Sequence, residues 1–332
     1  MLQQQALRQA PASQQIDTGY VVGADIGGTS LRLALAGMDG KILAKWKVST
    51  AGIRDPHVVV GLIEEGVDHL LRQNSIPRSL LRAVAAGAPG VTNVDEGVVI
   101  ATSYLMGWRN VPLRALLEAR LGVPAAVEND VNVAVIAESM IGAARGVRDF
   151  VFIAIGTGIG AGIMLNGQIF HGMNWSAGEI GYLLVPGTSV APIQAGEPGA
   201  LESIVGGEGI KSLWRSAWRA DLTRHSRELM ATQVFDYALA GDELATQVLD
   251  KSAQMLAYAI HNLAVVLNCP LFVLGGTVGM HPALWSATRG ILRQQDQHVQ
   301  LDLLRSTLGA DAQVSGAIQV AIETANSRVL TS

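Results

Sequence analysis

The sequence contains a single cysteine, Cys269, and this scarcity excludes whole classes of protein. One thiol can form neither an intramolecular disulfide nor a metal site built from several cysteines. Long apolar runs are also missing: none reaches membrane-spanning length, and residues 1–15 lack the apolar core of a signal peptide. We therefore predict a cytoplasmic protein without a membrane partner, and we expect residues 1–18 to form a disordered tail.

An excess of positive charge is missing as well, since the formal net charge is -4 over 332 residues. A protein that binds nucleic acid is expected to carry a strongly basic patch. Four arginines come nearest to one, and we predict that they lie on the solvated face of a helix: Arg215, Arg219, Arg224 and Arg227. The predicted partners therefore exclude nucleic acid. The many apolar residues and glycines, with few aromatics, fit a compact α/β protein that is long enough for two domains.

Hydrophobic patterning divides the chain into two halves that begin alike. In the first half we predict strands over 20–25, 30–36, 41–48, 83–86 and 125–127, and helices over 58–71, 112–121 and 131–141. In the second half we predict strands over 150–155, 160–165, 168–170 and 271–274, with helices around 256–267 and 316–325. Each half opens with strand, glycine turn, strand, hairpin turn and strand. This shared order predicts two related lobes.

Three glycine turns follow apolar strands in this pattern. Glycine lets backbone N–H groups approach a phosphate closely, and consecutive N–H groups form an anion-binding concavity. A single such turn is usually structural, but three in a duplicated architecture indicate a nucleotide site. The turns contain Gly27, Gly28 and Thr29; Gly156, Thr157 and Gly158; and Gly275 and Gly276. The Gly-x-x-x-x-Gly-Lys-Ser/Thr pattern of P-loop proteins does not occur.

Four carboxylates stand near these turns. Asp25 precedes the first turn, and Mg²⁺ prefers oxygen ligands while it retains several waters, so Asp25 is a candidate magnesium residue. Glu179 is flanked by glycines, and Glu202 stands at a predicted helix start, where its alternative role is to interact with the helix dipole. Asp130 follows Asn129 at a strand–helix junction, where side chains project into the ligand cleft of open α/β sheets. Either residue can instead be the helix N-cap, and from the residues alone both interpretations stay open.

In this order, the motifs resemble those of the ROK family (repressor, open reading frame, kinase) of sugar kinases. The resemblance runs from about Tyr20 to the C-terminal helix. Besides the three turns and the segments 128–132 and 177–181, it rests on Gly87-Ala88-Pro89-Gly90 and Leu105-Met106-Gly107-Trp108. It implies the two-lobed actin/hexokinase/Hsp70-like (ribonuclease H-like) α/β fold, with duplicated βββαβα units and an interlobe cleft. The implied small lobe covers 19–128, the large lobe covers 129–312, and a last helix, 313–330, packs back on the small lobe.

The resemblance also implies a role for each matched residue. Asp130 matches the catalytic aspartate, which takes the proton from the sugar hydroxyl as that hydroxyl attacks the γ-phosphate of ATP. The residues implied to line the sugar site are Gly87, Pro89, Gly90, Asn129, Glu179, Tyr182 and Glu202. Mg²⁺ and ATP are implied to lie against Asp25 and the three glycine turns, with Gly275 and Gly276 beside the adenosine. Family members often form dimers, so a homodimer is expected by resemblance alone.

The chain departs from the family at the residues that bind a structural zinc ion. Many members have a histidine at the position of Tyr182 and a cysteine cluster before Glu202, whereas residues 185–200 of this chain contain no cysteine. Zinc needs about four ligands in a tetrahedral array. We therefore predict no zinc site and a metal-free loop over 186–198. Because the family's histidine also contacts the sugar, Tyr182 alters the predicted sugar pocket.

The predicted function is ATP-dependent phosphorylation of a hexose, with glucose as the first candidate and glucose 6-phosphate as its product. Fructose, mannose, N-acetylglucosamine and N-acetylmannosamine are the alternative acceptors. A sugar-sensing transcriptional regulator is a rival, because the family includes repressors. Those carry a helix-turn-helix domain before the first turn, and fewer than twenty-five residues precede Asp25 here. A chaperone-like ATPase of the same fold is a further rival, against which the carboxylates argue.

Overall fold

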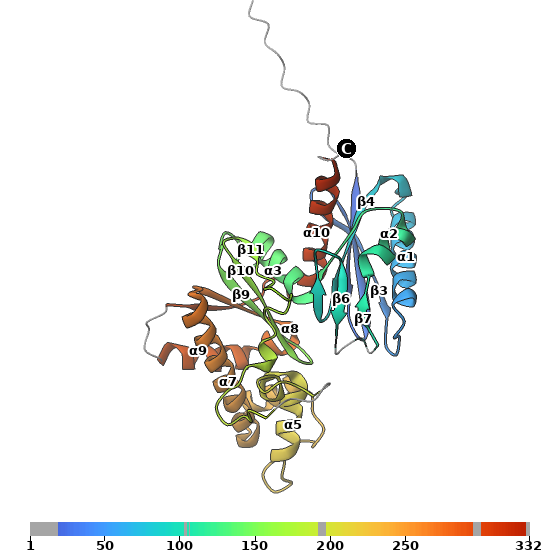
Figure 1. Cartoon of the computed structure of the whole chain (residues 1–332). Coiled ribbons are helices and arrows are strands. Elements are labelled where there is room, and N and C mark those ends of the chain that lie inside the picture. Colours follow the sequence, from blue (N-terminus) through green and yellow to red (C-terminus); the bar gives the residue numbers. More distant parts are fainter. Residues whose placement is uncertain (1–18, 103–104, 106, 192–196, 295–299, 330–332) are drawn as a thin grey trace, which may run out of the picture.

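The structure is a computed structural model that describes residues 19–102, 105, 107–191, 197–294 and 300–329. The tail predicted over 1–18 lies outside this range. The described residues form two lobes, each built around a five-stranded sheet (Figure 1). The small-lobe sheet has the order β3-β2-β1-β4-β8. Its strands are β1 (Tyr20–Ile26), β2 (Ser30–Gly37), β3 (Ile42–Ser49), β4 (Leu81–Ala88) and β8 (Ala125–Asn129).

Helices cover both faces of the small-lobe sheet, which explains why β1 and β4 are buried almost throughout. α1 (Pro56–Gln73) and α2 (Leu113–Leu121) pack on one face, and α10 (Ala312–Val329) packs on the other (Figure 1). Asp55 caps α1 by accepting a hydrogen bond from the backbone N–H of His57. A short helix, η1 (Arg78–Leu80), precedes β4. The first strand, β1, and the last helix, α10, therefore both belong to the small lobe.

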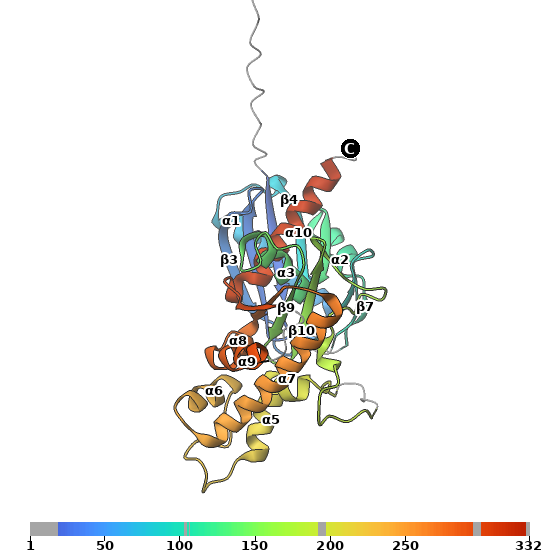
Figure 2. The same ribbon diagram turned by 90° about the vertical axis from the view of Figure 1, so that its left-hand side faces the viewer.

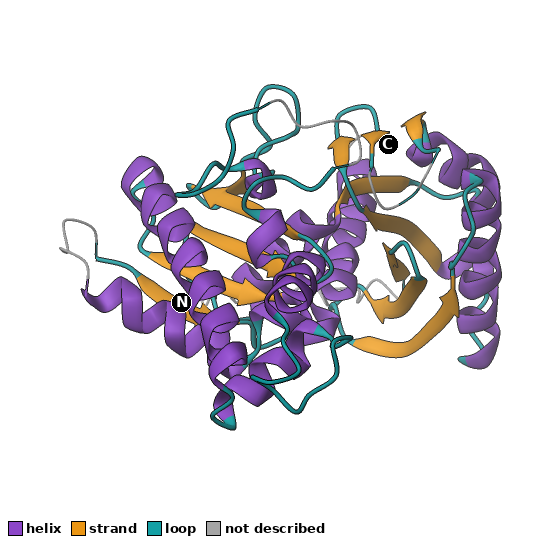
Figure 3. Cartoon of the chain, turned by 90° about the horizontal axis from the view of Figure 1, so that it is seen from below, coloured by secondary structure: helices purple, strands orange, loops and turns teal. Residues whose placement is uncertain are grey.

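The large-lobe sheet repeats this topology, as the duplicated strand order predicts (Figure 3). In both sheets the first strand pairs antiparallel with the second and parallel with the fourth, which pairs parallel with the fifth. The large-lobe order is β11-β10-β9-β12-β13. Its strands are β9 (Phe150–Ile155), β10 (Ile159–Leu165), β11 (Gln168–Ile169), β12 (Leu271–Gly275) and β13 (Asp302–Arg305).

One face of the large-lobe sheet packs against a cluster of helices, and the other packs against α3 (Asp130–Ile141). The helices of the cluster are α4 (Glu202–Val205), α5 (Gly207–Ala217), α6 (Ala231–Leu239), α7 (Glu243–Leu267) and α9 (Pro282–Gln294). The remaining short helices are η2 (Ile180–Tyr182), α8 (Gly276–Gly279) and η3 (Gly309–Asp311). Among the described residues, no helix is long and apolar enough to cross a membrane.

α3 and α10 pack against each other between the two sheets (Figure 2). A Cβ atom added at Gly316 of α10 would lie 1.6 Å from the carbonyl oxygen of Val133 in α3. A Cβ atom at Gly23 of β1 would lie 2.6 Å from the backbone nitrogen of Ile318. Glycine is therefore required at both contacts, and the small-residue face of α10 is the surface that approaches the small-lobe sheet and α3.

The structure corrects two details of the sequence-based description. Only Arg215 of the four arginines lies on a helix, because α5 ends at Ala217. Trp218 leaves the helix with extended backbone angles, and its indole Nε1 donates to the carbonyl of His225 at 3.0 Å, so the chain that follows is a loop. The sequence pattern also missed a small sheet in the small lobe, formed by β5 (Val91–Asn93), β6 (Val98–Ala101) and β7 (Arg109–Val111).

Candidate active site

Asp25 lies at the end of β1, directly opposite Arg32 in the antiparallel register with β2. Its Oδ2 accepts a hydrogen bond from Arg32 Nε at 2.7 Å and lies 2.6 Å from Arg32 Nη2. Burial raises the pKa of Asp25, and the charge and hydrogen bond of Arg32 oppose this effect. Arg32 also donates to the carbonyl of Ala310, just before α10. Asp25 Oδ1 takes part in neither contact with Arg32 and remains available to another ligand.

Two glycine turns present backbone N–H groups that have no acceptor among the residues that the structure describes. These N–H groups belong to Gly28 and Thr29 in the first turn, and to Thr157 and Gly158 in the second. Each turn is closed by its own hydrogen bond, from Gly27 N to Ser30 O at 2.9 Å and from Gly156 N to Gly158 O at 3.0 Å. A Cβ atom at Gly156 would meet nothing within 4 Å, so this backbone faces open space. Such free N–H groups fit phosphate oxygens.

The third glycine turn lies against the second. Gly276 has a φ of +76°, and a Cβ atom there would lie 2.3 Å from the carbonyl oxygen of Ile155, the residue before Gly156. A Cβ atom at Gly275 would lie 2.2 Å from the ring of Phe152. Only glycine allows this close approach. The structure therefore brings the predicted adenosine turn to the end of β9, next to the predicted phosphate turn.

Asn129, and not Asp130, is the N-cap of α3. Asn129 Oδ1 accepts hydrogen bonds from the backbone N–H groups of Val131 at 2.8 Å and Asn132 at 3.1 Å. Asn129 Nδ2 donates to the carbonyl of Gly90 at 2.8 Å, which ties the loop after β4 to this helix start. The sequence left open which of the two residues is the helix N-cap, and the structure assigns this role to Asn129. The cap does not require the carboxylate of Asp130.

Asp130 is the first residue of α3, and the charges of two other acids, Asp25 and Glu179, act on its carboxyl group. Burial is the largest effect that raises its pKa, the charge of Asp25 is the next largest and the charge of Glu179 adds to them, and the result is a pKa of about 7. A general base is most effective when its pKa lies near the working pH. The predicted sugar loop is adjacent, since a Cβ atom at Gly87 would lie 3.5 Å from Asp130 Cα and Pro89 is buried.

Glu179, Tyr182 and Glu202 form a second group of side chains on the large-lobe side of the site. Burial and the charge of Glu202 raise the pKa of Glu179. Burial and the charges of both glutamates raise the pKa of Tyr182, whose side chain is half exposed. Glu202 begins α4, and its Oε2 accepts a hydrogen bond from the backbone N–H of Ile159 at 3.1 Å. The bond of Glu202 to Ile159 places this group beside the second glycine turn, and the charge of Glu179 acts on Asp130.

Sequence reasoning assigned no role to three charged residues of this region. Arg32 was detectable, because the predicted hairpin places it opposite Asp25. Glu128 Oε2 contacts His171 Nε2 at 2.8 Å, and neither residue was assigned a function. No sequence signal identifies the partner of His171, because the two residues are 43 positions apart, with Glu128 on β8 of one lobe and His171 in the loop after β11 of the other.

The donor atoms beside the first glycine turn are of the kind that Mg²⁺ prefers. No group of three or more His, Cys, Asp or Glu residues that could hold a metal ion occurs in the part of the chain that the structure describes. Mg²⁺ keeps several waters and is commonly bound by one or two carboxylates together with substrate phosphates. Asp25 Oδ1, beside the N–H groups of Gly28 and Thr29, matches that donor set.

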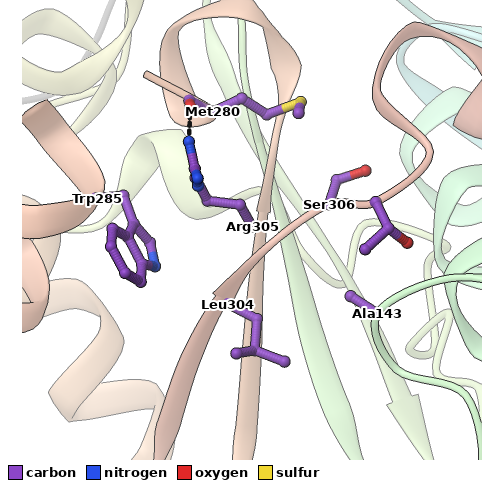
Figure 4. Close-up of a pocket in the computed structure, with 7 residues that line it drawn as sticks. Ala143, Met280, Trp285, Leu304, Arg305 and Ser306 are labelled. Carbon is purple, nitrogen blue, oxygen red and sulfur yellow. Dashed lines mark hydrogen bonds between the residues drawn. The ribbon is translucent and has the colours of Figure 1, made fainter. Parts of the chain in front are cut away.

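A separate cavity of about 490 Å³ lies beside β13 (Figure 4). It is lined by Ala143, Met280, Trp285, Leu304, Arg305, Ser306 and Thr307. The guanidinium carbon of Arg305 lies 5.3 Å from the centre of the Trp285 ring, and Arg305 Nη1 donates to the Met280 carbonyl at 3.4 Å. Neither a carboxylate nor a predicted site residue lines this cavity. This cavity is therefore separate from the predicted site residues.

Two lobes of one topology, with phosphate-type turns at their strand ends and several carboxylates between them, define a phosphotransferase of the actin/hexokinase type. The chain belongs to the ROK family, whose family model matches residues 21–324. It is 33% identical over 315 residues to a glucokinase of Halalkalibacterium halodurans, and the alignment covers 90% of this chain and 93% of that relative. It is 29% identical over 300 residues to an N-acetylmannosamine kinase of Citrobacter koseri, with coverages of 90% and 97%.

A solved structure extends the comparison to the fold. The crystal structure of a ROK family glucokinase from Streptomyces griseus, in complex with glucose and AMPPNP, superposes with a TM-score of 0.76 at 25% identity. The match covers 92% of this chain and 100% of that one. These findings confirm the predicted family and the predicted two-lobed fold, and they identify the chain as a glucokinase-like sugar kinase.

Proposed function

We propose that this chain transfers the γ-phosphoryl group of ATP to a hexose hydroxyl, with Asp130 as the general base. The observation that carries the proposal is that Asn129, and not Asp130, caps α3, which leaves Asp130 beside Gly87 of the predicted sugar loop. There, burial and the charges of Asp25 and Glu179 raise the pKa of Asp130 to about 7. Glucose is the first candidate acceptor, and the 33% identical glucokinase supports it. Other hexoses remain alternative acceptors, because an N-acetylmannosamine kinase is 29% identical to this chain.

In the proposed reaction, Asp130 accepts the proton of the sugar hydroxyl while that oxygen forms a bond to the γ-phosphorus and ADP departs. Such a transfer needs chiefly alignment and charge stabilisation. The free N–H groups of the first two glycine turns would hold the phosphates of ATP, and Asp25 would hold Mg²⁺, which would supply charge stabilisation of those phosphates. Glu179 and Glu202 accept hydrogen bonds from sugar hydroxyls. Asn129 retains one Nδ2 hydrogen for the sugar, because only the other Nδ2 hydrogen is donated to the Gly90 carbonyl.

The test is the rate of ADP release with Mg²⁺ and ATP in the presence of glucose, mannose, fructose, N-acetylglucosamine or N-acetylmannosamine. We expect sugar-dependent release with at least one hexose and the highest kcat/KM with glucose. Asp130→Asn is expected to lower kcat by roughly 10²–10⁴-fold. ADP release that no sugar stimulates, or full sugar-dependent activity in Asp130→Asn, contradicts the proposal.

Tyr182 is the proposed source of any difference in sugar preference from zinc-containing relatives. It is half exposed beside Glu179 and Glu202, so its ring can contact a bound sugar. Tyr182→His introduces the residue that the resemblance expects at this position. We expect the ratio of kcat/KM for glucose to that for N-acetylmannosamine to change, while Tyr182→Phe, which keeps the ring, changes it less. Equal ratios in all three proteins would exclude Tyr182 from the pocket.

A further inference from the structure

A hydrogen-bonded pair of side chains joins β8 of the small lobe to the loop after β11 of the large lobe, directly beside the start of α3. Glu128 stands on β8 of the small-lobe sheet and is 7% exposed. His171 follows β11 of the large-lobe sheet, and its Nε2 lies 2.8 Å from Glu128 Oε2. A carboxylate this buried needs partners for both of its oxygens. His171 supplies the only partner of Oε2 among the described residues.

The second oxygen of Glu128 holds the helix start that carries Asp130. Glu128 Oε1 accepts hydrogen bonds from the backbone N–H of Asn129 at 2.8 Å and from Asn132 Nδ2 at 3.0 Å. Asn129 in turn caps α3 and donates to the carbonyl of Gly90. A change in the position of the Glu128 carboxylate is therefore transmitted to the residues on both sides of Asp130.

On the other side of the pair, His171 lies at the start of the loop that leads from β11 to Glu179. The carbonyl of His171 accepts a hydrogen bond from the N–H of Ala177 at 3.1 Å, which closes the loop. The carbonyl of Gly178 accepts one from the N–H of Ala161 at 2.8 Å, which fixes the end of the loop on β10. Glu179 follows immediately. The imidazole of His171 thus ties this loop to the opposite lobe.

We propose that His171 is a positioning residue, which through Glu128 holds the Glu179 loop of the large lobe in register with the start of α3 and so sets the affinity for the sugar. The inference rests on the proposed kinase function, because it assigns Glu179 to the sugar and Asp130 to the proton. His171 itself touches no reacting atom. Its loss weakens sugar binding more than it slows the chemical step.

The protonation state of His171 makes this role depend on pH. The hydrogen bond to Glu128 raises the pKa of His171, burial opposes this effect, and the charges of Glu128 and Asp95 add to it. Glu128 on β8 and Asp95 in the turn between β5 and β6 are the charged groups that face the ring, and Asn132 on α3 is neutral. Below the raised pKa the pair is charge-assisted, and this strength is lost as the pH rises through it. We therefore expect the KM for the sugar to rise on the alkaline side.

Two variants of His171 separate its charge from its hydrogen bond. His171→Leu removes both, and we expect its KM for the hexose to increase about tenfold while kcat changes less than threefold. His171→Gln keeps a neutral donor, and we expect a KM that is close to the alkaline value of the unmodified chain and independent of pH between about 6 and 9. The matched control is His69→Gln on the exposed face of α1, which should leave the KM and its pH dependence unchanged. An unchanged KM and pH profile in His171→Leu overturns the inference.

A second measurement on the full chain does not depend on activity. The Cε1–Hε1 NMR signal of His171, assigned by its loss in His171→Gln, is expected to titrate at a higher pH in the unmodified chain than in Glu128→Gln, because the hydrogen bond to Glu128 raises the pKa of His171. A His171 pKa that is the same in these two proteins overturns the inference whatever the kinetics. If no sugar is phosphorylated while the NMR result holds, the proposed function fails although the pair exists. If a hexose is phosphorylated and His171→Leu keeps its KM, the inference alone fails.

Discussion

At the residue scale, the site is a concentration of acids that the protein holds at the expense of its own stability. Burial raises the pKa values of Asp25, Asp130 and Glu179, and the charge of a neighbouring acid raises those of Asp130 and Glu179 further. Arg32 offsets this only for Asp25, because its hydrogen bond and ion pair go to that carboxylate alone. A raised carboxyl pKa means that the ionised form is less stable in the folded chain than in the unfolded one. The proposed role of Asp130 as a general base and the stability of the fold therefore make opposite demands on this residue.

The first prediction is that Asp130→Asn stabilises the fold while it removes activity. The pKa of Asp130 is about 7 in the folded chain and near 3.8 when unperturbed, so its protonation favours folding below that range and this contribution is lost as the pH rises through 7. We expect the free energy of unfolding of Asp130→Asn to exceed that of the unmodified chain by about 1 to 3 kcal/mol at pH 8. The difference should shrink at pH 5. Urea unfolding at both pH values measures it.

The matched control is Asp250→Asn, since Asp250 is exposed on α7. That change is expected to alter the free energy of unfolding by less than about 0.5 kcal/mol at either pH. Equal free energies of unfolding of Asp130→Asn and the unmodified chain at pH 8 would show that the ionised Asp130 carboxylate does not destabilise the folded chain.

The second prediction concerns the acid limb of the pH profile. Because the base must be ionised, we expect kcat/KM to fall as the pH decreases below about 7, the pKa of Asp130. Asp25→Asn removes the charge that is the largest raising effect after burial. Its residual activity should therefore have an acid limb at lower pH. An acid limb that stays in place in Asp25→Asn, or one near pH 4 in the unmodified chain, would contradict the assignment.

Single residues also show how far sequence reasoning can reach. The segment Glu128-Asn129-Asp130 could be identified as important, but its division of labour could not, because a cap and a base are both short polar side chains at a helix start. The hydrogen bonds assign the cap to Asn129, and Asp130 as the base stays a prediction. Arg32 could be placed by register, since a hairpin fixes which residues face each other. His171 could not, because its partner is reached only through the packing of two lobes.

At the scale of elements, the sequence predicted the helix start at Glu202 and the strands of both large sheets except β13, but it did not predict α6, α9 or the small sheet. Continuous apolar runs and helical spacing predicted β1, β9 and the second half of α7, because each buries a wide face. β5 to β7 have three or four residues each, too few for a period to show. α4 and α8 have four residues each, and they form where glycine allows the chain to turn sharply onto β9. These short elements carry Glu202 and the adenosine turn.

The third prediction tests the contact between α3 and α10. Gly316→Ala would place a Cβ atom 1.6 Å from the carbonyl oxygen of Val133, so one backbone must move away from the other. We expect a loss of about 3 kcal/mol in the free energy of unfolding. The matched control is Gly290→Ala in α9, where an added Cβ meets nothing within 4 Å. That variant should gain about 0.5 to 1 kcal/mol from helix propensity. Similar effects of the two changes would mean that the helices are not packed this closely.

At the scale of the whole molecule, the duplicated lobes do not form two independent units. The chain passes from the small-lobe sheet to the large-lobe sheet through α3, and it returns through the segment between β13 and α10. Glu138 of α3 joins these two crossings, because its buried carboxylate accepts hydrogen bonds from Ser306 Oγ and from the N–H of Ala143. The duplication was predictable from strand order. The shared layer of α3 and α10 was not, and the predicted lobe boundaries and homodimer stay predictions.

The fourth prediction follows from that shared layer. If α3 and α10 serve both lobes, the loss of either sheet removes packing from the other, and the chain should unfold in one cooperative transition. Differential scanning calorimetry is expected to give a calorimetric enthalpy equal to the van't Hoff enthalpy. Gly316→Ala should move this whole transition to lower temperature without splitting it, because Gly316 lies at the contact on which both lobes depend. Two resolved transitions, with only one displaced in Gly316→Ala, would mean that each lobe completes its own core and that the α3–α10 contact acts as a hinge.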